Sequence, residues 1–484
     1  MRHISSRWGG SSGAARRWIH RRNHRRVHRR VHQAGQALVF GLCLLLLVSL
    51  LLFFQFSSGQ ASASKLRIVN ATDAAAYSVG LWRARAMNYY AYSNRAIIAN
   101  EVAIAQAATM VSYAKFLERF SDNVNDVARF IPYVGQVSEA IEEAAYWIST
   151  VTQYTAHGET AARSLYIQAL AASQELMFAA THPTVLSRIA AEVARENDRR
   201  FFAFTMPLSL DAGLRDITAR QEGEDRQRLK SVVLDSLDGF STHRDADLAE
   251  IPCLLKLARR GATELIRDHD TGELERWQAY DTLSLHSRRT FSCSMRERQA
   301  LGWGAAEIAQ DAKNELDALA ALAPAVTTGD AGIEPPGGGA ATASRPKRDN
   351  PRAYNEASKE IWVSNQYRGI ASVRELDFRN SESLRANSSF PLVKVAVVGW
   401  IQSADAVGTA ASRGLAAGRV MPVDRFSNRD SAVMGAVSAA EVYFRRPPQA
   451  LQRTEYASLY SPYWQVRLTP VPPAWRQAAV GYFQ

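Results

Sequence analysis

Residues 37–56 read ALVFGLCLLLLVSLLLFFQF, a run of twenty residues with no charge and only two polar side chains, Ser49 and Gln55. As a helix this run would span about 30 Å, the thickness of the hydrocarbon core of a bilayer. A cleavable secretory signal has a shorter apolar region of roughly 7–15 residues. Residues 61–63 read ASA, which fits a cleavage site, but the length of the run favours a retained transmembrane helix.

The distribution of charge predicts which side of the membrane each end of the chain occupies. The chain has 484 residues, 58 Lys+Arg and 47 Asp+Glu, for a net charge of +11. Residues 1–36 hold ten arginines, no lysine and no acidic residue, which leaves 48 basic and 47 acidic residues in the rest. The positive-inside rule therefore places 1–36 in the cytoplasm and 57–484 on the outer side of the membrane, in a single-pass protein. The balanced body does not favour a nucleic-acid partner.

The basic tail allows more than one interpretation. His20, His24, His28 and His32 are spaced so that a helix would place their imidazoles on one face, a spacing that can chelate zinc. The surrounding arginines would repel a dication, so we expect a topology determinant that also contacts anionic lipid headgroups. An arginine pair at 16–17 leaves a twin-arginine export signal as a further alternative.

Three cysteines fit this topology. Cys43 lies inside the apolar run and is expected to be a small apolar filler. Cys253 and Cys293 both lie in the exported part, where disulfides persist, and we expect them to pair. The pair would close a loop of about 40 residues and contribute about 4 kcal/mol in the chain-entropy model.

The exported part begins with an Ala-rich stretch that predicts a long helix. No proline precedes Pro132, so the helix can continue from the membrane to about Arg119. Alternating steps of four and three residues mark a stripe without charge, which we call the packing seam: Trp82, Ala86, Tyr89, Ser93, Ala96, Asn100, Ala103 and Ala107. This 3.5-residue spacing predicts packing against another helix, and small residues allow a close approach. The partner helix could belong to this chain or to another protein.

Further helices are expected at 137–176, after a break within 121–136, and from His182-Pro183 to about Arg200, with Thr181 as the cap. Residues 211–230 have the mixed charge of a solvated helix or connector. Strands are expected at 275–286, 392–401, 441–446 and 463–468.

These patterns predict a transmembrane helix that continues into a helical region, followed by a mixed α+β exported domain. The regions are a basic tail at 1–36, the transmembrane helix at 37–56, an Ala-rich helical region at 57–205, a mixed α/β region at 206–326, a Pro/Gly-rich linker at 327–352 and a strand-containing C-terminal region at 353–484.

A search for catalytic and ligand-binding motifs finds little. The sequence has no H-E-x-x-H, G-x-x-x-x-G-K-[ST], G-x-G-x-x-G or C-x-x-C, and its one G-x-S-x-G, at 9–13, lies in the basic tail. On the strand expected at 275–286, Ser284 and His286 share a face while Asp281 points to the other, which does not form a triad. We interpret Ser284 and His286 as polar residues on the solvated face of a sheet. No catalytic residue, cofactor, metal or small-molecule substrate is expected.

Aromatic residues gather near the C-terminus, and they are Tyr456, Tyr460, Tyr463 and Trp464. We expect them to be core or packing residues, with a surface for a partner as the alternative.

Several blocks of the sequence resemble one known family. They are GQALVF at 35–40 with the apolar run after it, residues 66–106, TLSLH at 282–286 with LGWG at 301–304, EVYF at 441–444, and EYASLYSPYWQVRL at 455–468. These blocks are similar to the TadG-like proteins of Tad/Flp pilus assembly. The resemblance implies a non-enzymatic inner-membrane or pilus-associated component whose partners are other pilus-assembly or pilin-like membrane proteins.

The chain also departs from the family's patterns. Prepilin-like members are cut after a glycine and carry a glutamate five residues into the mature chain. The corresponding bond here joins Gly35 and Gln36, and the fifth residue is Phe40, so the resemblance supports this processing site only weakly. Some longer relatives carry a D-x-S-x-S metal motif, which this sequence lacks.

The function expected from the sequence is a membrane-anchored component of pilus assembly, a minor pilin-like or scaffold subunit. The alternative is an anchored periplasmic receptor or sensor with a helical ligand-binding region, although 36 Arg-rich residues offer no cytoplasmic signalling domain. A hydrolase that uses Ser284 and His286 is a third, less favoured hypothesis.

Overall fold

The computed structural model describes residues 36–128, 134–206, 218–221, 227–267, 275–288, 293–310, 344–376, 393–402, 433–446 and 457–482. The chain divides into two compact units, Met1–Ser62 and Ala63–Gln484. The interpretations of the basic tail, including the histidine series, the arginine pair and Gly35 of the processing site, lie outside the described residues.

The first helix, α1, runs from Gln36 to Ala128, a length of 93 residues. Its first part, 37–56, exposes every side chain. It is the one helix of the described ranges that is long and apolar enough to cross a membrane. The helix passes the predicted end at Arg119, because residues 120–128 contain no glycine or proline to interrupt it.

Two further helices follow, α2 at Val134–Ala180 and α3 at Pro183–Asn197. Of the break expected within 121–136, residues 121–128 and 134–136 are helical. Residues 129–133 are not among the described residues. The cap of α3 is His182, whose Nδ1 accepts from the amide of Thr184, so the prediction for Thr181 is wrong. Pro183 occupies the first helical position and thus makes the residue directly before it the cap.

One sheet has four strands in the order β1-β9-β10-β11, and all its neighbours are antiparallel. Its strands are β1 at Phe202–Thr205, β9 at Val393–Gln402, β10 at Val433–Phe444 and β11 at Trp464–Thr469. β9 and β11 match the strands expected at 392–401 and 463–468 to within one residue, whereas β10 begins eight residues before the strand expected at 441–446 and ends two residues before its end.

A second sheet has five strands in the order β3-β4-β5-β6-β7, antiparallel except for the parallel pair β6 and β7. Its strands are β3 at Ala246–Ile251, β4 at Leu255–Arg267, β5 at Glu275–Arg288, β6 at Met295–Gln310 and β7 at Trp362–Tyr367. The smaller elements are β2 at Thr218–Arg220, β8 at Arg374–Leu376, α6 at Gln227–Asp235, α7 at Gly239–Thr242, α8 at Ser344–Asp349, α9 at Pro351–Lys359 and α13 at Pro473–Gly481.

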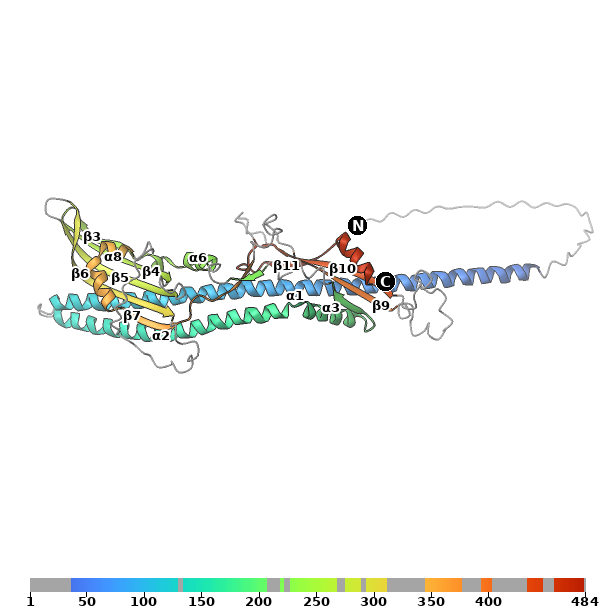
Figure 1. Cartoon of the computed structure of the whole chain (residues 1–484), viewed down its shortest axis with the longest axis horizontal. Helices are drawn as coiled ribbons and strands as arrows, with labels where there is room; N and C mark the ends of the chain where they lie inside the picture. Colours follow the sequence, from blue (N-terminus) through green and yellow to red (C-terminus); the bar gives the residue numbers. More distant parts are fainter. Residues whose placement is uncertain are drawn as a thin grey trace, which may run out of the picture. The chain divides into compact units, whose positions relative to one another are not determined.

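Within the second unit, both sheets pack along α1 (Figure 1). Buried residues of α1 between Ile68 and Val79 share a core with β9, β10 and α3. Those between Ala84 and Tyr90 join β10 and β11. Those between Ile97 and Val111 join the five-stranded sheet and α2. One helix therefore supplies the centre of all three cores.

The regions expected at 57–205, 206–326 and 353–484 do not separate, because each sheet combines strands that are distant in sequence. β1 pairs with β9, and β6 pairs with β7. Of the expected linker at 327–352, the described part from 344 onward is mostly helical. Of the stretch at 211–230, Thr218–Arg220 is a strand and pairs with β8.

Two glycines allow the two sheets to pack closely against α1, because a side chain at either position would overlap atoms of the helix. A methyl group at Gly304 of β6 would overlap the carbonyl oxygen of Ser112, and one at Gly399 of β9 would overlap the hydroxyl of Thr72. The carbonyl of Ser112 is part of the helix backbone and cannot rotate away, so the requirement at Gly304 is strict.

Gly304→Ala should lower the free energy of unfolding by about 1–3 kcal/mol, because the added methyl group forces the strand away from α1. Urea unfolding of the full-length chain in detergent, followed by circular dichroism, measures this. Gly239→Ala is the matched control, since a methyl group there meets no atom within 4 Å. Equal stability of the two variants would contradict this close packing.

Candidate functional site

The packing seam of α1 faces α2 of the same chain. Trp82 Nε1 donates to the carbonyl oxygen of Ala180 at 3.0 Å, and the Tyr89 hydroxyl donates to Ser173 Oγ at 2.5 Å. Further along, Arg163 Nη1 donates to Asn100 Oδ1 at 3.0 Å. The contacts on α2 move toward its N-terminus as those on α1 move toward its C-terminus, so the two helices are antiparallel.

The small residues of the packing seam differ in exposure. Ala86 and Ala107 are buried, whereas Ala96 and Ala103 are partly exposed. Ser93 is buried and accepts from Gln174 Nε2 of α2 at 2.7 Å. Of the two alternatives left by the sequence, these contacts correspond to a partner helix within the chain.

A buried amide pair connects this helix pair to the C-terminal region. Asn94 Nδ2 donates to the carbonyl oxygens of Arg374 and Leu459 at 2.8 and 2.9 Å. Gln174 Nε2 donates to Asn94 Oδ1 at 2.6 Å, while its Oε1 accepts from the amide of Arg374 at 2.9 Å. The two side chains satisfy backbone groups that would be costly to bury without partners.

Glu101 is a fully buried carboxyl on α1. Its Oε2 accepts from the Tyr367 hydroxyl at 2.8 Å and from Trp277 Nε1 at 3.5 Å, and its Oε1 has no hydrogen-bond partner among the described residues. Burial raises the pKa of Glu101 to about 8, an effect that these two donors reduce and nearby Glu275 increases. The carboxyl is therefore mostly protonated at neutral pH.

Asp281 lies on the face of β5 that packs against α1 and is fully buried. Ser112 Oγ of α1 donates to its Oδ2 at 2.9 Å, and Arg244 Nε donates to its Oδ1 at 2.7 Å. The carboxylate thus joins α1, β5 and the residues before β3 in one buried, hydrogen-bonded ion pair.

Ser284 and His286 lie on the other face of β5, as the alternation predicts, but that face is not solvated. Ser284 is 0% and His286 8% exposed, so the interpretation as a wet face is wrong. Asn350 and α9, which follow much later in the chain, cover this face. Ser284 Oγ donates to Glu297 Oε1 at 2.6 Å, and His286 Nε2 lies 2.9 Å from Asn350 Oδ1.

These contacts have a consequence for chemistry at β5. The hydroxyl of Ser284 is committed to Glu297, which also accepts from the backbone amides of Arg352 and Ala353 at the start of α9. Asp281 is on the opposite face and bonded to Arg244. Asp281, Ser284 and His286 therefore do not form a hydrogen-bonded chain, and each of them connects a different part of the chain to β5. The described residues contain no group of histidine, cysteine or acidic side chains arranged to hold a metal.

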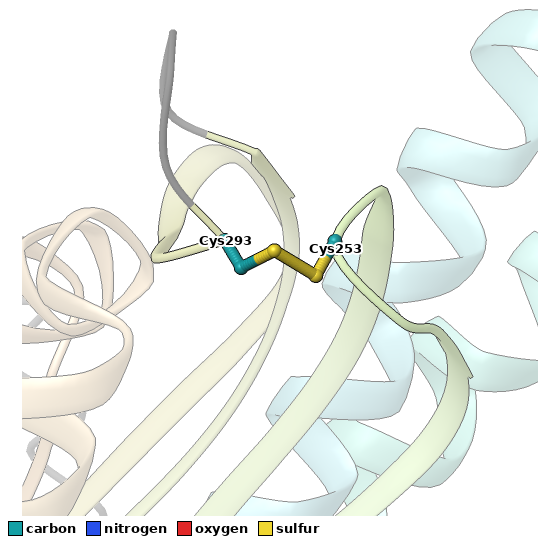
Figure 2. Close-up of a disulfide and its surroundings, with 2 residues drawn as sticks. All are labelled: Cys253 and Cys293. Atoms are coloured by element: carbon teal, nitrogen blue, oxygen red, sulfur yellow. A yellow bond between two sulfur atoms is a disulfide. The ribbon is translucent and has the colours of Figure 1, made fainter.

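Cys253 and Cys293 form a disulfide, with their Cα atoms 4.5 Å apart (Figure 2). Cys253 lies in the turn between β3 and β4 and has a positive φ of 59°. Cys293 lies just before β6. The bond joins the β3–β4 turn to the segment before β6 at one end of the five-stranded sheet, where Leu255 and Arg296 both pair with Ser287. Cys43 is a free, exposed cysteine.

The C-terminal aromatic residues are core residues where they are described. Trp464 is buried and its ring lies 5.3 Å from that of Phe444. Tyr463 packs against the same cluster and Tyr460 is partly buried beside α6, where Arg228 lies 5.8 Å from its ring. Tyr456 lies outside the described residues.

Sequence reasoning missed the buried polar residues of α1. Glu101 is one of them, and it is 0% exposed. The sequence did contain a signal that Glu101 is buried, because it lies among isoleucines that form a second apolar face on the helix: Ile97, Ile98 and Ile104.

Glu101 predicts a pH dependence of stability. Its folded pKa of about 8 exceeds the ordinary value of 4.5, so the stabilisation is fully present below pH 4.5 and is lost as the pH rises through 8. Each unit of pKa difference corresponds to about 1.4 kcal/mol. The wild-type chain should therefore lose a few kcal/mol relative to Glu101→Gln, which keeps both acceptor contacts but does not titrate. Parallel urea titrations at pH 5 and 8.5 measure the difference, and identical pH profiles would contradict this assignment.

Removal of the disulfide by Cys253→Ser with Cys293→Ser should cost about 4 kcal/mol, since the bond closes a loop with a sequence separation of 40. The same denaturation assay measures this, with Cys43→Ser as the control. An unchanged unfolding midpoint in the double variant would show that the bond does not constrain the unfolded chain.

Comparison of the chain with protein-family models, curated proteins and solved structures finds no significant match.

Proposed function

We propose that this chain is a non-enzymatic, membrane-anchored component of Tad/Flp pilus assembly, a minor pilin-like or scaffold subunit. The observation that carries the proposal is the continuity of α1. Its exposed apolar start and the central helix of the folded body belong to one uninterrupted helix.

The segments that resemble TadG-like proteins support this assignment by their positions in the fold. Thr282 of the 282–286 block pairs with Trp303 of the 301–304 block on neighbouring strands. Phe444 of the 441–444 block pairs with Trp464 of the 455–468 block. The resemblance thus follows pairs of strands that pack along α1, which is where a shared architecture would be expected to retain sequence.

The proposed location is the inner membrane, with residues 1–36 in the cytoplasm and the folded body in the periplasm. The positive-inside rule supports this orientation. The Cys253–Cys293 disulfide supports it independently, because such bonds persist in oxidising compartments.

The contacts of the polar residues favour a structural role over catalysis. Ser284 and His286 are buried and bonded to Glu297 and Asn350. The interface between α1 and α2, where a receptor of this design would bind its ligand, is bridged directly by side chains of the two helices.

Deletion of the gene should abolish or sharply reduce surface pili, counted by electron microscopy. The wild-type chain and Ser284→Ala should restore them. Leu46→Arg with Leu50→Arg should not, because each arginine costs about 3 kcal/mol in a membrane helix. Leu46→Ile with Leu50→Ile is the matched control for the anchor.

Normal piliation of the deletion strain would contradict the assembly role. Loss of complementation by Ser284→Ala in a chain that still folds and reaches the membrane would contradict a non-enzymatic role.

A further inference from the structure

The helix α2 carries an apolar stripe on its exposed face. Alternating steps of four and three residues from 137 to 179 meet no charged side chain, and every position in this series is exposed. We call this series the outer α2 stripe. Its largest members, which are 47% to 74% exposed, are Val137, Ile141, Ile148, Val151, Leu165 and Leu176.

The buried face of α2 combines apolar and polar residues, and Ala156, Ile167 and Ala171 pack there in the core shared with α1. Ser149, Thr160, Ser164 and Gln174 are almost completely buried there. In an ordinary surface helix the apolar residues face the core and the polar residues face water. A helix that buries hydroxyls and exposes aliphatic side chains along its length has a second packing surface on its outside.

We propose that the outer α2 stripe pairs with the same stripe of a second copy of this chain, as a parallel, in-register two-stranded coiled coil. The spacing of 3.5 residues is the repeat that keeps one face of a helix against a partner through a left-handed supercoil. The parallel orientation rests on the proposed function, because copies anchored in one membrane point in the same direction.

The flanking residues are compatible with self-pairing. In a parallel pair, the residues that directly precede stripe positions 141, 148, 155, 162, 169 and 176 each face the residue five positions later on the partner. In this arrangement Glu159 lies opposite Tyr154, and Glu175 lies opposite Ala180. Because no like charges oppose each other, a second copy meets no electrostatic penalty at this surface.

The apolar area is sufficient for a stable pair. Trp147, Tyr154 and Tyr166 flank the stripe and are each just over half exposed. At about 200 Å² for an aromatic and about 100 Å² for an aliphatic side chain, these residues and the six largest stripe residues expose about 700 Å². Two copies would bury about 1,400 Å², in the lower range of specific interfaces.

The composition of α2 disfavours a lipid surface as the occupant. The helix contains five glutamates and one arginine. Helices that lie on membranes are rich in Lys and Arg, which bind anionic headgroups.

Site-directed crosslinking tests the pairing. In full-length Cys43→Ser chain in lipid vesicles, single cysteines at Ile148, Val151 or Leu165 should give dimers with a short bismaleimide. Glu139→Cys is the control, because residue 139 is exposed but lies off the stripe, and it should give few crosslinked dimers. Crosslinking at none of the three stripe positions, or equally at residue 139, would overturn the proposal. Dimers at a single stripe position only would overturn the parallel register.

A charge variant provides a second measurement. Ile148→Glu with Val151→Glu should dissociate the pair, seen as a halved protein mass in sedimentation, without changing the circular dichroism, since both residues are exposed. Tyr146→Glu, off the stripe, should stay dimeric. A wild-type chain that is monomeric, or that binds only a different protein through this stripe, would overturn self-pairing. Both assays use the purified chain and therefore test self-pairing separately from the pilus phenotype. Either proposal can be contradicted while the other is supported.

Discussion

The close approach of two sheets and a second helix to α1 is the constraint on which the fold depends. Each of the three largest cores contains a consecutive section of this helix. Alanine supplies many of the buried positions, and Gly304 and Gly399 remove side chains from the strands at the points of nearest contact. A break in α1 would divide a core from its neighbours, whereas a break in any one strand would affect a single sheet.

Contacts between small apolar side chains fix the position of α1 only weakly, because a shift along the helix replaces one alanine by another at the same contact. The buried polar groups supply the missing specificity. The side chain of Asn94 can donate to the carbonyl oxygens of Arg374 and Leu459 in only one arrangement of the backbone. The carboxylate of Asp281 needs hydrogen bonds from both Ser112 and Arg244. The bonds of Asn94 and Ser112 fix the rotation and axial position of α1, because a shift of one residue would leave a buried polar group without its partner.

Much of this architecture could be predicted from the sequence, because it depends on local pattern. The apolar run, the unbroken helix after it and the alternation that places Asp281 opposite Ser284 are of this kind. The cover over Ser284 and His286 could not be predicted, since it comes from α9, more than sixty residues later. The parallel pairing of β7 with β6 is another long-range contact without a local signal. The outer α2 stripe differs, because the spacing that predicts the packing seam also runs through α2 and was open to detection.

Native-state hydrogen exchange of the full-length chain in lipid nanodiscs tests the central position of α1 most directly. Peptides from β5 and β10 report on the two sheets separately. If both sheets depend on α1, the protected amides of β5, β10 and residues 68–111 should lose protection together, with one opening free energy, as urea is added. Opening of one sheet at a clearly lower free energy, with α1 and the other sheet still protected, would contradict this account.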